Sequence, residues 1–108
     1  MSKKIFYSPL AQQDLAEISD YIAEELGSPI TAAGIVEEIL DRVDLLAQFP
    51  ESGTPLSSIC SIQSSYRFVI SHGYLAFYRV LDAVYVDRIL HQRRDYLRVL
   101  LGGESSFD

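Results

Sequence analysis

Apolar residues recur at helical spacing in the first half of the chain. In residues 9–26 and again in residues 29–49 they return every three or four positions, with acidic residues between them, as in amphipathic helices. Each segment follows a serine and opens with a proline, a pair that caps a helix and suits its first turn. Gly27 and Pro50 are the expected end points. Because so short a break separates the two segments, they should form an antiparallel helical hairpin.

The pattern changes from helical to alternating after residue 65. Residues 66–70, 74–80 and 84–90 are rich in β-branched and aromatic side chains and are separated by short turns, so they predict an antiparallel meander. Residues 4–7 predict a further short strand, and residues 91–101 a short final helix that stops at two glycines. The predicted order is β-α-α-β-β-β-α, an α+β fold in which the helical hairpin packs against a mainly antiparallel sheet.

Residues 51–65 connect the hairpin to the meander and contain six serines, one glycine and one proline, which is typical of a loop. We expect Ile59, Cys60 and Ile62 to fix this loop to the core. Neither a linker nor an internal repeat interrupts the pattern. With 108 residues, the chain therefore predicts a single domain spanning residues 1–108.

The composition narrows the class of protein. A hydrophobic fraction of 48% is ordinary for a folded globule, and a single cysteine excludes an internal disulfide framework. The sequence contains no apolar run near the roughly 18 residues of a membrane span and no secretory signal, which predicts a cytoplasmic protein without a membrane partner. The sequence also lacks a metal-ligand cluster, a glycine-rich phosphate loop and a nucleophile arrangement. We therefore expect no metal and no cofactor.

Charge is distributed unevenly along the chain. Residues 1–51 carry three basic and ten acidic side chains, a net charge of −7, whereas residues 66–98 carry six arginines against three aspartates, a net charge of +3. An overall charge of −6 makes general coating of nucleic acid a poor interpretation, although a local arginine surface can still meet an anion. The six arginines are Arg67, Arg79, Arg88, Arg93, Arg94 and Arg98.

Four segments together carry a resemblance to a known family. They are residues 8–15 at the start of the acidic hairpin, then residues 66–67, 73–80 and 88–95 in and after the meander. In this combination, over residues 3–101, the chain resembles the RelE/ParE superfamily of bacterial toxins from type II toxin–antitoxin modules. The resemblance implies a growth-inhibiting toxin that forms a hetero-oligomer with a cognate antitoxin protein.

The superfamily uses one fold for two activities, so the fold does not decide between them. RelE-like members cut messenger RNA on the ribosome, and ParE-like members poison DNA gyrase. Where the RelE pattern has an arginine directly after the tyrosine that opens the second meander strand, this chain has Leu75 after Tyr74. The run Arg-Ile-Leu-His-Gln at 88–92 is similar to ParE. The resemblance therefore favours a gyrase poison, with a ribosome-dependent endoribonuclease and an inactive antitoxin-binding scaffold as alternatives.

A ribonuclease of this kind would be metal-free and would need a base, cations that stabilise the phosphorane, and an acid. The resemblance implies that basic residues of the meander and the C-terminal segment, with a late tyrosine or histidine, supply these roles. The catalytic candidates are Arg67, His91, Arg93, Arg94 and Tyr96. For contact with the target, gyrase or ribosome with messenger RNA, the candidates are Arg67, Arg93, Arg94 and Arg98.

Each basic candidate also has an ordinary structural interpretation. His91 can be a half-buried structural histidine, Arg79 can pair with Asp87 across the sheet, and Arg88 and Arg98 can form salt bridges to the acidic hairpin. The sequence also leaves open the charge of the antitoxin tail and the way in which it binds. It could be basic, to meet the hairpin, or acidic, to cover the arginines, and it could bind as a helix in a groove or as an added strand.

Overall fold

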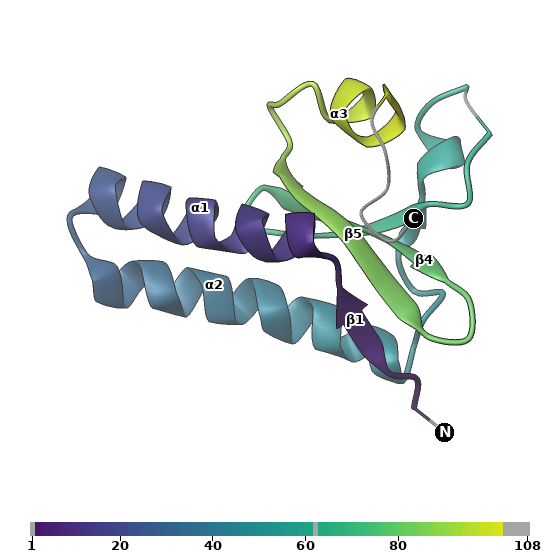
Figure 1. The fold of residues 1–108 in the computed structure, drawn as a ribbon, viewed down its shortest axis with the longest axis horizontal. Coiled ribbons are helices and arrows are strands. Elements are labelled where there is room, and N and C mark those ends of the chain that lie inside the picture. Colours follow the sequence, from purple (N-terminus) through teal and green to yellow (C-terminus); the bar gives the residue numbers. More distant parts are fainter. Residues whose placement is uncertain (1, 62, 103–108) are drawn as a thin grey trace.

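The computed structural model describes residues 2–61 and 63–102, and these form an α+β domain around a five-stranded sheet (Figure 1). The helical hairpin covers one face of the sheet, and a short C-terminal helix with a loop covers part of the other. No helix within the described ranges is both long and apolar enough to cross a membrane. In chain order the elements are β1 (Ile5–Tyr7), α1 (Pro9–Leu26), α2 (Pro29–Asp44), the 3-10 turn η1 (Leu45–Ala47), β2 (Thr54–Pro55), the 3-10 turn η2 (Leu56–Ser58), β3 (Arg67–Ser71), β4 (Tyr74–Val80), β5 (Val84–His91) and α3 (Tyr96–Gly102).

The sheet has the order β1-β5-β4-β3-β2 and is antiparallel except where β1 runs parallel to β5. Phe77 lies opposite Arg88 while Tyr78 lies opposite Val86, so Asp87 is an extra residue in β5 and forms a β-bulge. The α+β fold and the mainly antiparallel sheet predicted from the sequence are both confirmed.

The serine caps predicted for the hairpin are present. Ser8 Oγ accepts a hydrogen bond from the backbone N–H of Ala11 at 2.9 Å, and Ser28 Oγ accepts one from that of Thr31 at 3.2 Å. Gly27 ends α1 in the left-handed conformation, with φ +62°. The second helix is shorter than predicted, because its last turn tightens into η1 before the chain turns away.

The main core lies between the hairpin and the sheet. Apolar side chains from one face of each helix interlock with those from the facing side of β3, β4 and β5. The largest of its fully buried side chains is Tyr78, whose hydroxyl accepts a hydrogen bond from the backbone N–H of Gly53 at 2.9 Å. The most deeply buried members, 2% exposed or less, are Ala11, Ala32, Ile39, Val43, Leu46, Ala76, Tyr78, Val84, Val86 and Ile89.

A second, smaller core lies on the other face of the sheet, where Leu56 and Leu100 pack on Leu75, Phe77 and Leu90. The helix above it begins at residue 96, so the prediction that it begins at residue 91 is wrong. The β-ladder continues instead, because residue 91 pairs with residue 74 and the N–H of residue 92 donates to the carbonyl of residue 73 at 2.8 Å.

The loop after the hairpin is fixed by a different residue from those expected. Leu56 is fully buried, whereas Ile59 is 50% exposed, so the expectation for Ile59 is wrong. Cys60 does pack against the second core, and Ile62 lies outside the described residues. The difference arises because η2 turns Leu56 inward while the N–H of Leu56 bonds the carbonyl of Tyr66 at 2.9 Å.

Candidate partner-binding groove

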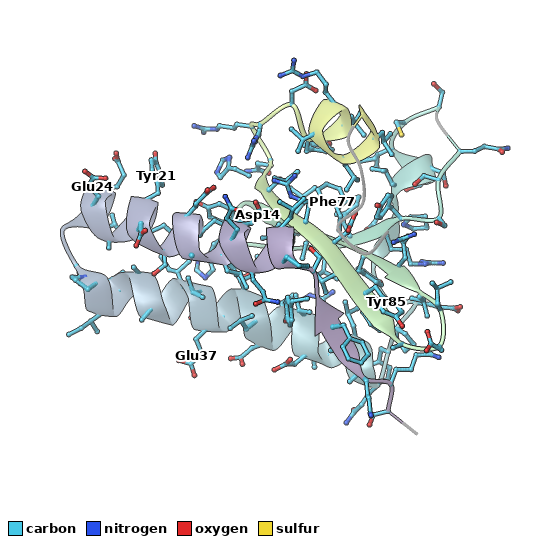
Figure 2. The ribbon with its side chains drawn as sticks, viewed as in Figure 1. Asp14, Tyr21, Glu24, Glu37, Phe77 and Tyr85 are labelled. Carbon is cyan, nitrogen blue, oxygen red and sulfur yellow. The ribbon has the colours of Figure 1, made fainter. Side chains whose placement is uncertain are left out.

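A cleft of about 400 Å³ lies between α1 and the C-terminal end of β5. Figure 2 shows Asp14 beside β5 and Tyr21 further along α1, so this helix forms one wall of the cleft. The turn that follows β5 forms the opposite wall. Its lining residues are Asp14, Glu17, Ile18, Tyr21, Tyr74, Ile89, Leu90, His91, Arg93 and Arg94.

A second hollow of about 280 Å³ continues this cleft towards the tip of the hairpin. The two hollows share Tyr21, Tyr74 and His91, and the second adds apolar side chains such as Leu26 and Ile35. Together they form one elongated groove along α1, which we call the α1 groove. Its floor is largely apolar, so it suits a segment of protein better than a small polar molecule.

The acidic wall of the α1 groove is fixed by Asp14. This buried carboxylate accepts hydrogen bonds from Nε and Nη2 of Arg88 at 2.8 and 2.9 Å, and from the backbone N–H of Ile89 at 2.9 Å. The hydrogen bond to Asp14 is the largest cause that raises the pKa of the Arg88 guanidinium above its ordinary value. Arg88 is therefore a structural cation, and the expected salt bridge from Arg88 to the hairpin is confirmed.

The basic wall is formed by the turn after β5. His91 Nδ1 accepts a hydrogen bond from the backbone N–H of Arg93 at 3.1 Å, and the His91 ring meets the Tyr74 ring edge-on with centroids 5.1 Å apart. His91 is half-buried, as its structural interpretation expected. Arg93 and Arg94 are exposed, and within the described ranges neither forms an ion pair.

The other predicted site residues lie elsewhere. Arg67 on β3 donates from Nη1 to the carbonyls of Glu51 and Gly53 at 3.1 and 2.9 Å, which ties the loop after α2 to the sheet. Tyr96 packs in the second core with its ring 5.4 Å from that of Phe77.

Arg98 is exposed on α3 and lies 3.5 Å from the carboxylate of Asp95, so the salt bridge expected from Arg98 to the hairpin is wrong. Of the predicted site residues, the structure therefore gathers only His91, Arg93 and Arg94.

Asp87 is not the residue directly opposite Arg79 in the sheet. The register places Arg79 opposite Tyr85, because the bulge shifts the strands, and the Arg79 guanidinium lies 5.5 Å from the centre of the Tyr66 ring. The Tyr66 hydroxyl in turn donates to Asp87 at 2.6 Å. Tyr66 thus contacts both Arg79 and Asp87.

The acidic half of the groove is not predicted by the sequence analysis, which treats the acidic residues of the segment 9–26 as lying between its apolar positions. Asp14 is only 5% exposed and falls in register with the buried residues Ala11, Ile18 and Ile22. A carboxylate in line with an apolar stripe is a signal that could have been read, since buried carboxylates are paired. No comparable signal in the sequence indicates that Tyr21 and Tyr74 line the groove.

The α1 groove combines charged walls with an apolar floor. Its walls carry opposite charges about an apolar floor, and among the residues that the structure describes no cluster of His, Cys, Asp and Glu could hold a metal ion. This arrangement fits an extended or helical partner segment with charges of both signs. Fold and site thus define a small α+β domain with a candidate groove for a partner segment.

Comparison with known proteins identifies the family. Residues 5–96 match the family model described as "ParE toxin of type II toxin-antitoxin system, parDE", so the chain belongs to the ParE toxin family. A Sinorhizobium fredii protein (strain NBRC 101917 / NGR234) named "Putative toxin Y4kP" is 31% identical over 99 residues, which cover 91% of this chain and 97% of that one. The predicted toxin class is confirmed.

A solved structure supports the fold independently. The chain "Chromosomal ParDE TA system from P. aeruginosa" superposes with a TM-score of 0.70 over 83% of this chain and 96% of that one, at 22% sequence identity. At this identity the likeness concerns the fold alone.

Proposed function

We propose that this ParE-family toxin acts in the cytoplasm on DNA gyrase, stabilising the cleaved gyrase–DNA complex, and that it does not cut RNA. The observation that carries this proposal is that two of the five ribonuclease candidates lie apart from the three that line the α1 groove. Arg67 is engaged with two loop carbonyls, and Tyr96, the first residue of α3, packs against the second core, whereas His91 lines the α1 groove. Acid–base cleavage needs such groups within hydrogen-bond reach of one phosphate.

The exposed cations at the rim of the α1 groove are the proposed contact with the target. Arg93 and Arg94 lie side by side in the chain and line the cleft, and guanidinium groups suit phosphate and carboxylate oxygens. Gyrase bound to DNA offers both kinds of anion. Arg67 and Arg98 are less suited to the role, since the first is held by the loop and the second lies outside the groove.

A cognate antitoxin is the proposed neutralising partner, with one of its segments seated in the α1 groove. The sequence left open whether that segment is acidic or basic, and the groove favours one that is both. Its carboxylates would meet Arg93 and Arg94, while a basic residue on its other side would meet Glu17. An antitoxin seated in this way covers the target-binding cations, which accounts for neutralisation by occlusion.

The decisive experiment compares the two targets directly. Purified toxin is incubated with gyrase and supercoiled plasmid, and in parallel with translating ribosomes whose messenger is followed by primer extension. We expect cleaved plasmid to accumulate in the first reaction, to disappear when the protein from the adjacent gene is added, and no new messenger ends in the second. Ribosome-dependent messenger cuts without an effect on gyrase would overturn the proposal in favour of a RelE-like ribonuclease.

A further inference from the structure

A row of side chains crosses the face of the sheet opposite the hairpin. Ile5 and Tyr7 pack against the hairpin core, so Phe6 between them points to the other face. The register aligns Phe6 with Tyr85, and Tyr85 with Arg79, on three adjacent strands. The Phe6 and Tyr85 rings are stacked with centroids 5.6 Å apart.

This row lies at the end of the sheet that α3 and η2 do not cover. Both of those elements pack over Leu75, Phe77 and Leu90 in the second core. Phe6 remains 45% exposed, and Leu81 in the β4–β5 turn is 61% exposed. Lys3 ties that turn to the N-terminus, because its ammonium donates to the Leu81 carbonyl at 3.1 Å. We call Phe6, Leu81 and Tyr85 the Phe6 face.

The Phe6 face is far from the α1 groove along the same strand. Tyr85 lies near the start of β5 and His91 ends it, and six residues of extended strand span about 20 Å. Figure 2 likewise shows Tyr85 near one end of β5 and Asp14 near the other. A segment seated in the groove therefore leaves the Phe6 face open to a different contact.

The charges beside the Phe6 face are mainly positive. Lys3 and Lys4 lie next to the row, whereas the Arg79 guanidinium is engaged with the Tyr66 ring. The nearby carboxylate of Asp82 accepts a hydrogen bond from the Tyr85 hydroxyl at 2.9 Å. Residues 5–51 carry a net charge of −9, so this local excess stands out. Aromatic and arginine side chains around an exposed apolar centre are the residues that dominate binding energy in protein interfaces.

We infer that the Phe6 face is a second docking surface, which binds an apolar patch rimmed by carboxylates on the gyrase protein while Arg93 and Arg94 meet its anionic DNA-bound region. This inference rests on the proposed function. A protein surface fits better than a nucleic acid, because large exposed apolar side chains need an apolar counterpart and the chain as a whole is acidic.

The test measures binding of the full-length toxin to purified gyrase holoenzyme. The variant Phe6→Ala with Leu81→Ala is compared with a control that removes two exposed apolar side chains from the hairpin side, Ile30→Ala with Leu45→Ala. We expect the first variant to bind gyrase at least about tenfold more weakly, and the control to bind within about twofold of the wild type. Both variants should retain wild-type affinity for the antitoxin and nearly the same Tm.

Each other outcome has a definite meaning. If the Phe6 and Leu81 variant binds gyrase as tightly as the wild type, the Phe6 face is not a docking surface, although the proposed function stands. If the variant loses affinity only for free single-stranded or duplex DNA, the face binds nucleic acid and the inference is wrong. A wild-type dimer in light scattering that the variant abolishes would assign the face to a second copy of the chain. Failure of the wild type itself to bind gyrase would overturn the proposed function as well.

Discussion

Asp14 and Arg88, 74 residues apart, form a bidentate ion pair that joins the first helix to the last strand. The pair lies where β1 ends, so that β5 continues with β4 on one side and no strand on the other. Ser8 Oγ donates to the Asp87 carbonyl at 2.7 Å, and Asp14 accepts from the Ile89 N–H, so the start of α1 replaces the missing strand. The same carboxylate thereby seals the edge of the sheet and sets one wall of the α1 groove.

Removing the carboxylate of Asp14 should destabilise the fold strongly. Asp14→Ala leaves the Arg88 cation, only 17% exposed, and the Ile89 N–H without their partner, and breaking a buried pair in this way costs about 3–5 kcal/mol. Glu17→Ala, on the exposed side of the same helix, should change the free energy of unfolding by less than about 0.5 kcal/mol. Urea unfolding monitored by circular dichroism measures both.

A double-mutant cycle isolates the pair itself. Asp14→Ala combined with Arg88→Ala should cost less than the sum of the two single changes, because the second change removes the charge that the first leaves buried. Strict additivity would contradict the assignment of Arg88 as a structural cation and return it to the set of candidate partner-binding arginines.

Two glycines on the hairpin side of the fold should respond to alanine in opposite directions. A Cβ at Gly53 would lie 2.7 Å from Tyr78 Cε1 and 2.8 Å from the Phe68 carbonyl oxygen, so Gly53→Ala should destabilise by about 1–3 kcal/mol. A Cβ at Gly34, inside α2, meets nothing within 4 Å, so Gly34→Ala should stabilise by about 0.5–1 kcal/mol. Thermal unfolding should therefore give a lower Tm than the wild type for Gly53→Ala and a higher Tm for Gly34→Ala. A higher Tm for both variants would show that the loop at Gly53 moves to make room for the added methyl group.

The sequence predicted the elements far better than the site, for physical reasons. Helix caps and strand alternation are local, so Ser8, Gly27 and the strand 74–80 could be located from neighbouring residues alone. The end of β5 could not, because its extension to His91 depends on pairing with Tyr74 on another strand. The α1 groove likewise depends on Asp14 meeting β5 across 74 residues, a contact with no local signal beyond the misplaced carboxylate.

The arginines show the same limit of prediction from sequence. Arg67, Arg93 and Arg98 carry the same side chain, so the sequence alone groups them together as target-binding candidates. The structure separates them by what each guanidinium meets, namely loop carbonyls for Arg67, no described carboxylate for Arg93, and Asp95 for Arg98. Since exposure and partners are properties of the assembled fold, a one-dimensional pattern could nominate these residues but could not rank them.

Alkaline pH should destabilise the protein through Tyr7. Burial, followed by the charge of Asp44, raises the pKa of the Tyr7 phenol above its ordinary value of 10.0, so the folded state favours the protonated form. That contribution is present below pH 10 and is lost as the pH rises towards the raised pKa.

The variant Tyr7→Phe separates this effect from those of other tyrosines. The Tyr7 hydroxyl is buried and has no hydrogen-bond partner among the described residues, so its removal should leave stability at pH 7 unchanged or raise it by up to about 1 kcal/mol. The variant should also lose less stability than the wild type between pH 9 and pH 12, as measured by urea unfolding along a pH series. A steeper alkaline loss in the variant would contradict the assignment.

Reversing the two cations at the rim of the α1 groove should remove activity without unfolding the protein. Arg93 and Arg94 are exposed and form no ion pair within the described ranges, so Arg93→Glu with Arg94→Glu should shift Tm by no more than a few degrees. The same change places carboxylates where the proposed partners carry anions, so we expect growth arrest on induced expression to be abolished and antitoxin affinity to fall at least about tenfold.

Arg98→Glu provides the control for this last prediction. Arg98 carries the same charge a few residues further along the chain and is 82% exposed, but it lies outside the groove and already meets Asp95. Its reversal should leave both growth arrest and antitoxin affinity close to those of the wild type. If the Arg93 and Arg94 variant remains fully toxic while Arg98→Glu does not, the working cation lies on the exposed side of α3 and not at the groove. If both variants remain toxic, neither arginine surface contacts the target, and the Phe6 face becomes the principal contact to test.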